Sequence, residues 1–159
     1  MPLVGNTVDR LNGGRFVTEQ LASAIIGHLV GDYILQNDWM ALNKKNRFLP
    51  CFIHCILYTC SICLFIINEF RMQKINTMVL IAAGIFLSHF LIDYTNIVDR
   101  YLGWIGGRSW KNTENLIRKL VNIYSPHICI AYAAIVSTVV DNTLHLMLMY
   151  FLFTFTIQF

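Results

Sequence analysis

Six ionisable side chains lie within or at the start of long apolar runs of this sequence, where such groups are costly and usually functional. They are His28, Asp32, His54, His89, Asp93 and His127. His28 and Asp32 stand four residues apart, and so do His89 and Asp93, so each pair shares one face of a helix. An imidazole and a carboxylate in this arrangement can hold one metal ion or share one proton. The set therefore predicts a metal site or a proton site.

The six side chains also share a depth. A helix rises about 1.5 Å per residue, so counting from the ends of the apolar runs places all six within roughly 15 Å of one membrane face. Polar side chains also join membrane helices by simple hydrogen bonds, and for any single histidine that is the better interpretation. A common layer across four apolar runs instead favours one shared site.

Imidazole nitrogens and carboxylate oxygens suit a divalent transition metal, with zinc as the first expectation and manganese or iron as alternatives. Six ligands suffice for two ions, and a two-metal site polarises a phosphoryl or acyl group and activates a water. The residues expected to support the ligands or to contact a substrate are Tyr33, Gln36, Tyr94, Asn96 and Arg100. His145 has no partner in this pattern, and we leave it outside the predicted site.

The elements that must position these residues are membrane-spanning helices. The 159 residues are 56% hydrophobic and 13% charged, with a mean hydropathy of +0.55, whereas soluble domains carry roughly 25% charged residues. A spanning helix needs about 20 mostly apolar residues. The sequence therefore predicts an all-α integral membrane helical bundle, a single transmembrane domain over residues 1–159 with four or five transmembrane helices. The predicted spans are residues 16–37, 48–67, 77–98, 126–140 and 144–159.

The number of spans depends on the sequence Asp141-Asn142-Thr143. Because Asp and Asn suit turns and helix N-caps, we expect a turn here that divides residues 126–159 into a hairpin. One continuous span is the alternative. Between the third and fourth spans, a loop is expected from Tyr101, followed by one interfacial amphipathic helix over residues 113–125.

Charge sets the expected orientation. The loops after the first and third spans hold eight Lys and Arg residues, against four in the N-terminal segment and the remaining loop. The side with more positive charge is usually cytoplasmic, so we expect a multi-pass protein of the bacterial cytoplasmic (inner) membrane with its N-terminus outside. The net charge of +3 is too small and too scattered to indicate nucleic-acid binding. Ser23, Gly27 and Gly31 form a stripe of small residues that lets the first span approach a neighbouring helix closely.

Three segments together carry a resemblance. They are GHLVGDYILQNDWMALNKK at residues 27–45, the lone His54 and SHFLIDYTN at residues 88–96. They resemble a family of small bacterial and phage integral membrane proteins known only as a domain of unknown function, over roughly residues 20–130 of this chain. The chain departs from that family before His127, where Tyr124-Ser125-Pro126 replaces an acidic and an amide residue. A more distant similarity to membrane-bound metal-dependent hydrolases implies hydrolysis at a metal.

Three functions remain open from the sequence. The first is a membrane-embedded metal-binding protein, a metal-dependent hydrolase acting on a phosphoester or lipid-linked substrate at the cytoplasmic leaflet. The second is an ion or proton pathway, or a small transporter, that uses the same His and Asp residues. The third is a non-catalytic membrane interaction protein, encoded by a phage in one version of this hypothesis. The expected partners are the lipid bilayer and such a substrate, with a homo-oligomer or a protein partner left open.

Overall fold

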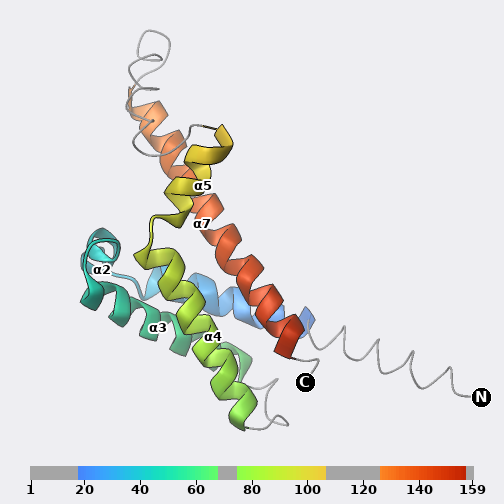
Figure 1. Ribbon diagram of the computed structural model, residues 1–159. Coiled ribbons are helices and arrows are strands. Elements are labelled where there is room, and N and C mark those ends of the chain that lie inside the picture. Colours follow the sequence, from blue (N-terminus) through green and yellow to red (C-terminus); the bar gives the residue numbers. More distant parts are fainter. Residues whose placement is uncertain (1–17, 68–74, 107–125, 157–159) are drawn as a thin grey trace, which may run out of the picture.

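A computed structural model describes residues 18–67, 75–106 and 126–156 of the chain. Within these residues the structure is helical and contains no strand, which confirms the all-α class (Figure 1). A helix over residues 18–29 continues into a π-helical turn, η1 (Val30–Ile34). The other elements are α2 (Asp38–Asn43), α3 (Phe48–Ile66), α4 (Ile75–Tyr94), α5 (Ile97–Gly106) and α7 (Pro126–Thr156).

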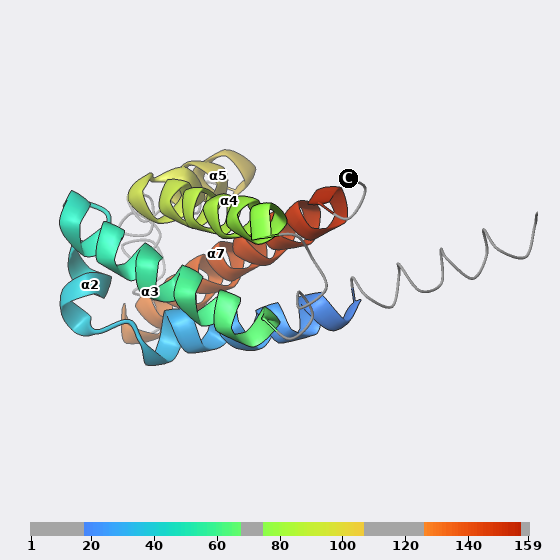
Figure 2. The same cartoon turned by 90° about the horizontal axis from the view of Figure 1, so that it is seen from below.

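The long helices form a bundle in which α4 packs against both α3 and α7. Helices α4 and α7 run in opposite directions, and the first helix lies against α3 (Figures 1 and 2). The short helix α2 lies in the connection between the first helix and α3. Asn37 caps the N-terminus of α2, because its side chain accepts a hydrogen bond from the Met40 backbone N–H at 3.0 Å. One end of the bundle therefore gathers the end of η1, the start of α3 and the end of α4.

Three described helices are long and apolar enough to cross a membrane, namely Phe48–Ile66, Ile75–Tyr94 and Ile130–Thr156. This finding is consistent with a membrane protein. The expected count of four or five spans is not confirmed. The first predicted span, residues 16–37, is described as helical from residue 18 through η1, and it is not one of the three.

Helix α7 corrects the predicted hairpin, because it continues without a break through Asp141, Asn142 and Thr143. The Asn142 side chain donates to the Thr138 carbonyl at 2.8 Å, and the Thr143 hydroxyl donates to the Val139 carbonyl at 2.7 Å. These bonds reach back four residues along the same helix, so the polar side chains are satisfied without a turn.

The loop expected from Tyr101 is also corrected, since α5 occupies residues 97–106. Val98 and Leu102 on α5 are buried, and Val136 and Val140 of α7 pack against the same small cluster. The other side of α5 leaves Trp104 exposed. The predicted interfacial helix over residues 113–125 lies outside the described residues.

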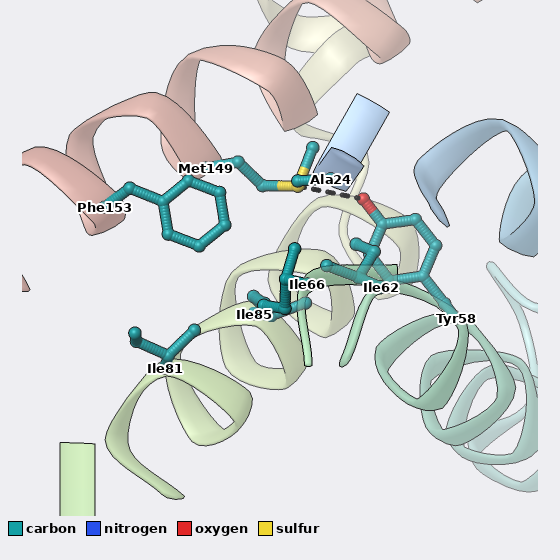
Figure 3. Close-up of a cluster of buried hydrophobic side chains, with 8 residues drawn as sticks. All are labelled: Ala24, Tyr58, Ile62, Ile66, Ile81, Ile85, Met149 and Phe153. Atoms are coloured by element: carbon teal, nitrogen blue, oxygen red, sulfur yellow. Dashed lines mark hydrogen bonds between the residues drawn. The ribbon is translucent and has the colours of Figure 1, made fainter. Parts of the chain in front are cut away.

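An apolar core fills the half of the bundle away from the turn at α2 (Figure 3). Its buried members are Ala24, Tyr58, Ile62, Ile66, Ile81, Ile85, Met149 and Phe153. The first helix reaches this core through its glycines, because a Cβ on Gly27 would lie 2.7 Å from the Ile62 Cα. The Ser61 hydroxyl also donates to the Gly27 carbonyl at 2.9 Å. The small-residue stripe at Gly27 thus allows the close helix contact that its sequence predicts.

Candidate metal centre

Four of the predicted ligands meet in the half of the bundle next to α2. Asp32 comes from η1, His54 from α3, and His89 and Asp93 from α4. His54, His89 and Asp93 are at most 1% exposed, and the side chain of Asp32 is 12% exposed. The close approach of the first helix to α3 at Gly27 and the packing of α3 on α4 bring these three segments together.

One atom from each of these four residues faces the same small space. The Nε2 atoms of His54 and His89 lie 2.9 Å apart. Asp32 Oδ1 lies 3.2 Å from the His54 Nε2 and 3.6 Å from the His89 Nε2. Asp93 Oδ2 lies 3.1 Å from the His54 Nε2 and 3.3 Å from the His89 Nε2.

These separations match the spacing of ligands around a small divalent cation. Zinc binds nitrogen and oxygen at about 2.0–2.1 Å in a tetrahedron, which places neighbouring ligand atoms about 3.3–3.4 Å apart. The five distances above, 2.9 to 3.6 Å, bracket that value. In addition, Asp32 Oδ1 and Asp93 Oδ2 are buried and make no well-oriented hydrogen bond within the described residues. Asp32 Oδ1 is therefore suited to bind a cation, whereas Asp93 Oδ2 already lies 2.8 Å from the Lys44 ammonium, which a metal at this place would have to displace.

His145 belongs to this cluster, which corrects its exclusion in the sequence analysis. Its ring lies 4.3 Å from the His89 ring, measured between centroids, and its Nε2 lies 4.0 Å from Asp93 Oδ1. Asp141, one turn earlier on α7, places its carboxylate 3.7 Å from the His145 Nδ1. Two further sets of three candidate ligands include His145, one with Asp32 and His89 and one with Asp93 and Asp141.

The signal for these two residues was present in the sequence. Asp141 and His145 are a third pair of Asp and His four residues apart, in reversed order. The expected turn at Asp141 concealed it, because two residues in a turn would not share a helix face. We refer to the six residues Asp32, His54, His89, Asp93, Asp141 and His145 as the His/Asp cluster.

The His/Asp cluster carries more negative than positive charge. It holds three carboxylates, and within the described residues Lys44 is the one lysine or arginine that forms an ion pair with it, 2.8 Å from Asp93 Oδ2. Burial disfavours the charged form of Lys44, but the neighbouring Asp93 outweighs burial and raises the pKa of the lysine above its ordinary value. With neutral imidazoles, two negative charges are left without a partner, which is costly away from water. One divalent cation would balance them.

His28 lies beside the cluster but is already fully hydrogen-bonded. Its Nε2 lies 2.6 Å from Asn142 Oδ1, and its Nδ1 lies 2.9 Å from the Tyr58 hydroxyl. Because the Asn142 amide nitrogen donates to Thr138 O, the amide oxygen faces His28 and accepts from its Nε2–H. The Nδ1 of neutral His28 then accepts from Tyr58. Both ring nitrogens of His28 thus have hydrogen-bond partners, so we do not assign His28 as a metal ligand although its Nδ1 lies 3.3 Å from Asp32 Oδ2.

His127 does not join the cluster. It is exposed near the start of α7, and the 18 residues to His145 correspond to about 27 Å of helix. Of the residues expected around the ligands, Tyr33 accepts from Asn142 at 2.7 Å and Gln36 accepts from Lys44 at 3.0 Å. The other three, Tyr94, Asn96 and Arg100, are exposed and do not line the pocket beside the cluster.

That pocket has a volume of about 270 Å³. Asp32 and Asp141 form the part of its wall that belongs to the His/Asp cluster, and Lys44 and Lys45 form another part. Ser137 and Thr138 of α7 add hydroxyl groups. The cluster is thus buried on the bundle side and reached from a polar pocket on the other.

A protein-family model described as "Protein of unknown function (DUF3307)" matches residues 21–159, most of the chain. This match is consistent with the expected resemblance to an uncharacterised family. No curated protein and no solved structure shows significant similarity to the chain.

Proposed function

We propose that this chain, which belongs to the DUF3307 family, is a membrane-embedded metalloprotein that hydrolyses a phosphoester. Its divalent cation, zinc as the first candidate, would be held by Asp32, His54, His89 and Asp93. The observation that carries the proposal is the convergence of four ligand atoms, because each carboxylate oxygen lies 3.1 to 3.6 Å from both imidazole nitrogens, which are 2.9 Å apart. The unbalanced negative charge of the cluster supports a cation at the same place.

The donor set and the pocket favour a catalytic metal over a structural one. Structural zinc sites are closed, and most are rich in cysteine, whereas catalytic sites keep a position open to solvent or substrate. Here the ligand atoms come from His and Asp, and Asp32 also lines the pocket of about 270 Å³. Because four protein ligands would fill a tetrahedral zinc site, a molecule in that pocket would meet the metal as a fifth ligand on the Asp32 side.

The residues around the pocket suit hydrolysis of a phosphate ester. A bound divalent metal supplies polarisation of a phosphoryl oxygen and a water of lowered pKa. Lys44 and Lys45 offer ammonium groups to the anionic phosphate, and Lys44 is within reach of the cluster through Asp93. Asp141 also lines the pocket, where its carboxylate would accept a proton from an attacking water, while the His145 Nδ1 is hydrogen-bonded to the Asp141 backbone carbonyl at 2.9 Å.

The proposed place of this chemistry is the cytoplasmic leaflet of the bacterial inner membrane. The His/Asp cluster lies near the end of the bundle where η1 ends and α3 begins, next to Lys44, Lys45 and Arg47. An excess of Lys and Arg marks the cytoplasmic side, so the pocket would open toward that surface with the N-terminus outside.

Conduction of ions or protons is less well supported. A path would need polar groups from the cluster to the opposite end of the bundle. The interior beyond the cluster is instead filled by the apolar core, whose central members Ile62, Ile85 and Met149 are at most 2% exposed. The described interior thus favours a site reached from one side.

Metal content tests the proposal. The full chain, extracted from membranes in detergent without chelator, is analysed by elemental mass spectrometry. We expect about one equivalent of zinc, manganese or iron per chain. His54→Gln should lose most of this metal, because it removes one of the two imidazoles that face each other at 2.9 Å.

His127→Gln is the matched control, since it makes the same change at an exposed histidine of α7 that lies far from the His/Asp cluster. It should retain the metal of the wild type. Circular dichroism and size-exclusion chromatography establish that both variants are folded, and Asp93→Asn provides a second cluster variant. A folded wild-type protein without metal would reject the metalloprotein. Bound metal without hydrolysis of p-nitrophenyl phosphate or of phosphorylated lipids would reject the hydrolase alone.

A further inference from the structure

A second pocket adjoins the polar one. It has a volume of about 320 Å³ and shares Tyr33, Thr138 and Asn142 with the pocket beside the cluster. Both pockets lie between the first helix with η1 and the middle of α7. The hydrogen bond from Asn142 to the Tyr33 hydroxyl, 2.7 Å long, stands at their junction. The two hollows are therefore neighbouring parts of one groove.

The two parts have opposite chemistry. The part beside the cluster presents Lys44 and Lys45 and, from the cluster, the carboxylates of Asp32 and Asp141. The other part has four aliphatic side chains in its wall, which are Ile25, Leu29, Val139 and Leu146. With a cation bound at the cluster, a ligand that fills both parts would carry an anionic group at one end and a hydrocarbon chain at the other.

The length of the groove also matches one leaflet of a bilayer. One wall extends from Gln36, two residues after η1, back to Ile25 on the first helix, and the other extends on α7 from Ser137 to Leu146. At about 1.5 Å per residue, these walls cover roughly 14 to 16 Å, which is half of the ~30 Å hydrocarbon thickness. The polar part lies at the end of the bundle that carries the basic loop, and the apolar part extends toward the bundle middle. This is the depth of one leaflet.

We infer that the groove binds a membrane lipid with an anionic phosphate headgroup, with the phosphate at Lys44 and Lys45 and one hydrocarbon chain along Ile25, Leu29 and Val139. The inference rests on the proposed function in one respect. A cation at the His/Asp cluster offsets the carboxylates of Asp32 and Asp141, which would otherwise repel a phosphate. Half-exposed Leu29, Tyr33 and Val139 leave the groove open to the surrounding lipid, so the ligand enters sideways from its own leaflet.

Photo-crosslinking tests this inference on the full chain in phosphatidylcholine vesicles that contain a minority of diazirine-tailed phosphatidic acid. We expect labelling of α7 around Val139 to Leu146, with competition by unlabelled phosphatidic acid. Lys45→Gln should reduce labelling about tenfold, the value of one charge-assisted hydrogen bond. Val139→Trp should reduce it at least as much, because the indole fills the apolar part of the groove.

Leu148→Trp is the control, since nine residues at 100° each place Leu148 on the opposite face of α7, and it lines neither pocket. It should label as the wild type does. Equal labelling by diazirine-tailed phosphatidylcholine, full competition by inorganic phosphate, or normal labelling of Val139→Trp would each overturn the inference. The metal content of the same samples separates the two proposals. Normal metal without selective labelling rejects only the lipid, whereas absence of metal in the wild type rejects the proposed function.

Discussion

The two halves of the bundle use the same helix faces for opposite chemistry. Each face repeats every four residues, and all of its residues except the partly exposed Asp141 are buried. The faces are His54-Tyr58-Ile62-Ile66 on α3, Ile81-Ile85-His89-Asp93 on α4 and Asp141-His145-Met149-Phe153 on α7. In the half near α2 these faces present His and Asp, and in the other half they present Ile, Met and Phe. Residues of the apolar half fit one another mainly by shape, with one contact from the Tyr58 hydroxyl to the Met149 sulfur at 4.0 Å (Figure 3). Residues of the polar half carry charges, of which Lys44 pairs with Asp93, and in the proposed function a cation would balance the rest.

The comparison suggests a division of labour. The apolar core fixes the spacing of the helices, and this spacing holds the ligand atoms of the His/Asp cluster close together before any metal is bound. The cost of gathering three carboxylates is then offset when a cation binds. Variants in the two halves should therefore respond differently to the removal of metal.

The largest effect is expected in the apolar half. Ile85 is fully buried, so Ile85→Ala leaves a cavity and should lower the free energy of unfolding by about 3 kcal/mol. Because the residue lies outside the cluster, the loss should be the same with and without a chelator. Chemical unfolding in mixed micelles, followed by circular dichroism, measures both values.

Leu87→Ala on the same helix is the control, because Leu87 is 58% exposed, and its effect should stay within about 0.5 kcal/mol. If folded Ile85→Ala protein lost its metal, the two halves would not be independent, and the division of labour would be wrong.

Gly27→Ala should have an intermediate effect that reaches both halves. The new methyl group would lie 2.7 Å from the Ile62 Cα, and a backbone atom cannot move aside as a side chain does. Overpacking of this kind costs about 2 kcal/mol. The first helix must then shift away from α3, carrying Asp32 away from His54, so metal affinity should fall at least about tenfold.

Gly84→Ala separates this backbone contact from a general effect of added volume. Its methyl group would also lie 2.7 Å from a neighbour, but that neighbour is the Cδ1 atom of the Leu152 side chain, which can rotate. Metal affinity should be unchanged, as measured by competition with a chromogenic chelator. Equal losses in both variants would contradict the role assigned to the approach of the first helix to α3.

Tyr33→Phe should have the smallest effect. It removes a hydroxyl that accepts a hydrogen bond from Asn142 at the junction of the two pockets. Hydrogen bonds between membrane helices contribute about 0.6 kcal/mol on average, so the free energy of unfolding should change by about that amount. Metal content should stay at the wild-type level, and its loss would mean that Tyr33 belongs to the metal centre.

Much of the polar half could be predicted from spacing. His28 with Asp32 and His89 with Asp93 each stand four residues apart, and the helices do place each pair on one face. These pairs lie next to His54 because all of these residues share one depth in neighbouring helices. The sequence could not reveal that His28 is saturated by Tyr58 and Asn142, because both partners come from other helices.

The errors in the prediction for α7 have one physical origin. Asp141 and Asn142 favour turns when considered alone, but their polar groups find partners within α7 and across the bundle. Because residues 126–159 were predicted as two helices that separate at this point, Asp141 and His145 were not recognised as a pair on one helix face. The predicted hairpin also placed His127 near the site. Lys44 was counted only for orientation, because a loop residue gives no local sign that it pairs with Asp93 on α4.

X-ray absorption spectroscopy of the metal-loaded protein tests the central claim most directly, because it identifies the ligand atoms. A metal bound by the His/Asp cluster should show nitrogen and oxygen neighbours at about 2.0 Å, with the outer scattering of two or more imidazole rings and no sulfur. Cys51 and Cys55 are buried on the same helix as His54, with their sulfur atoms 3.9 Å apart, and they are the alternative ligands. Sulfur at about 2.3 Å, or a spectrum without imidazole scattering, would contradict a centre built from the His/Asp cluster.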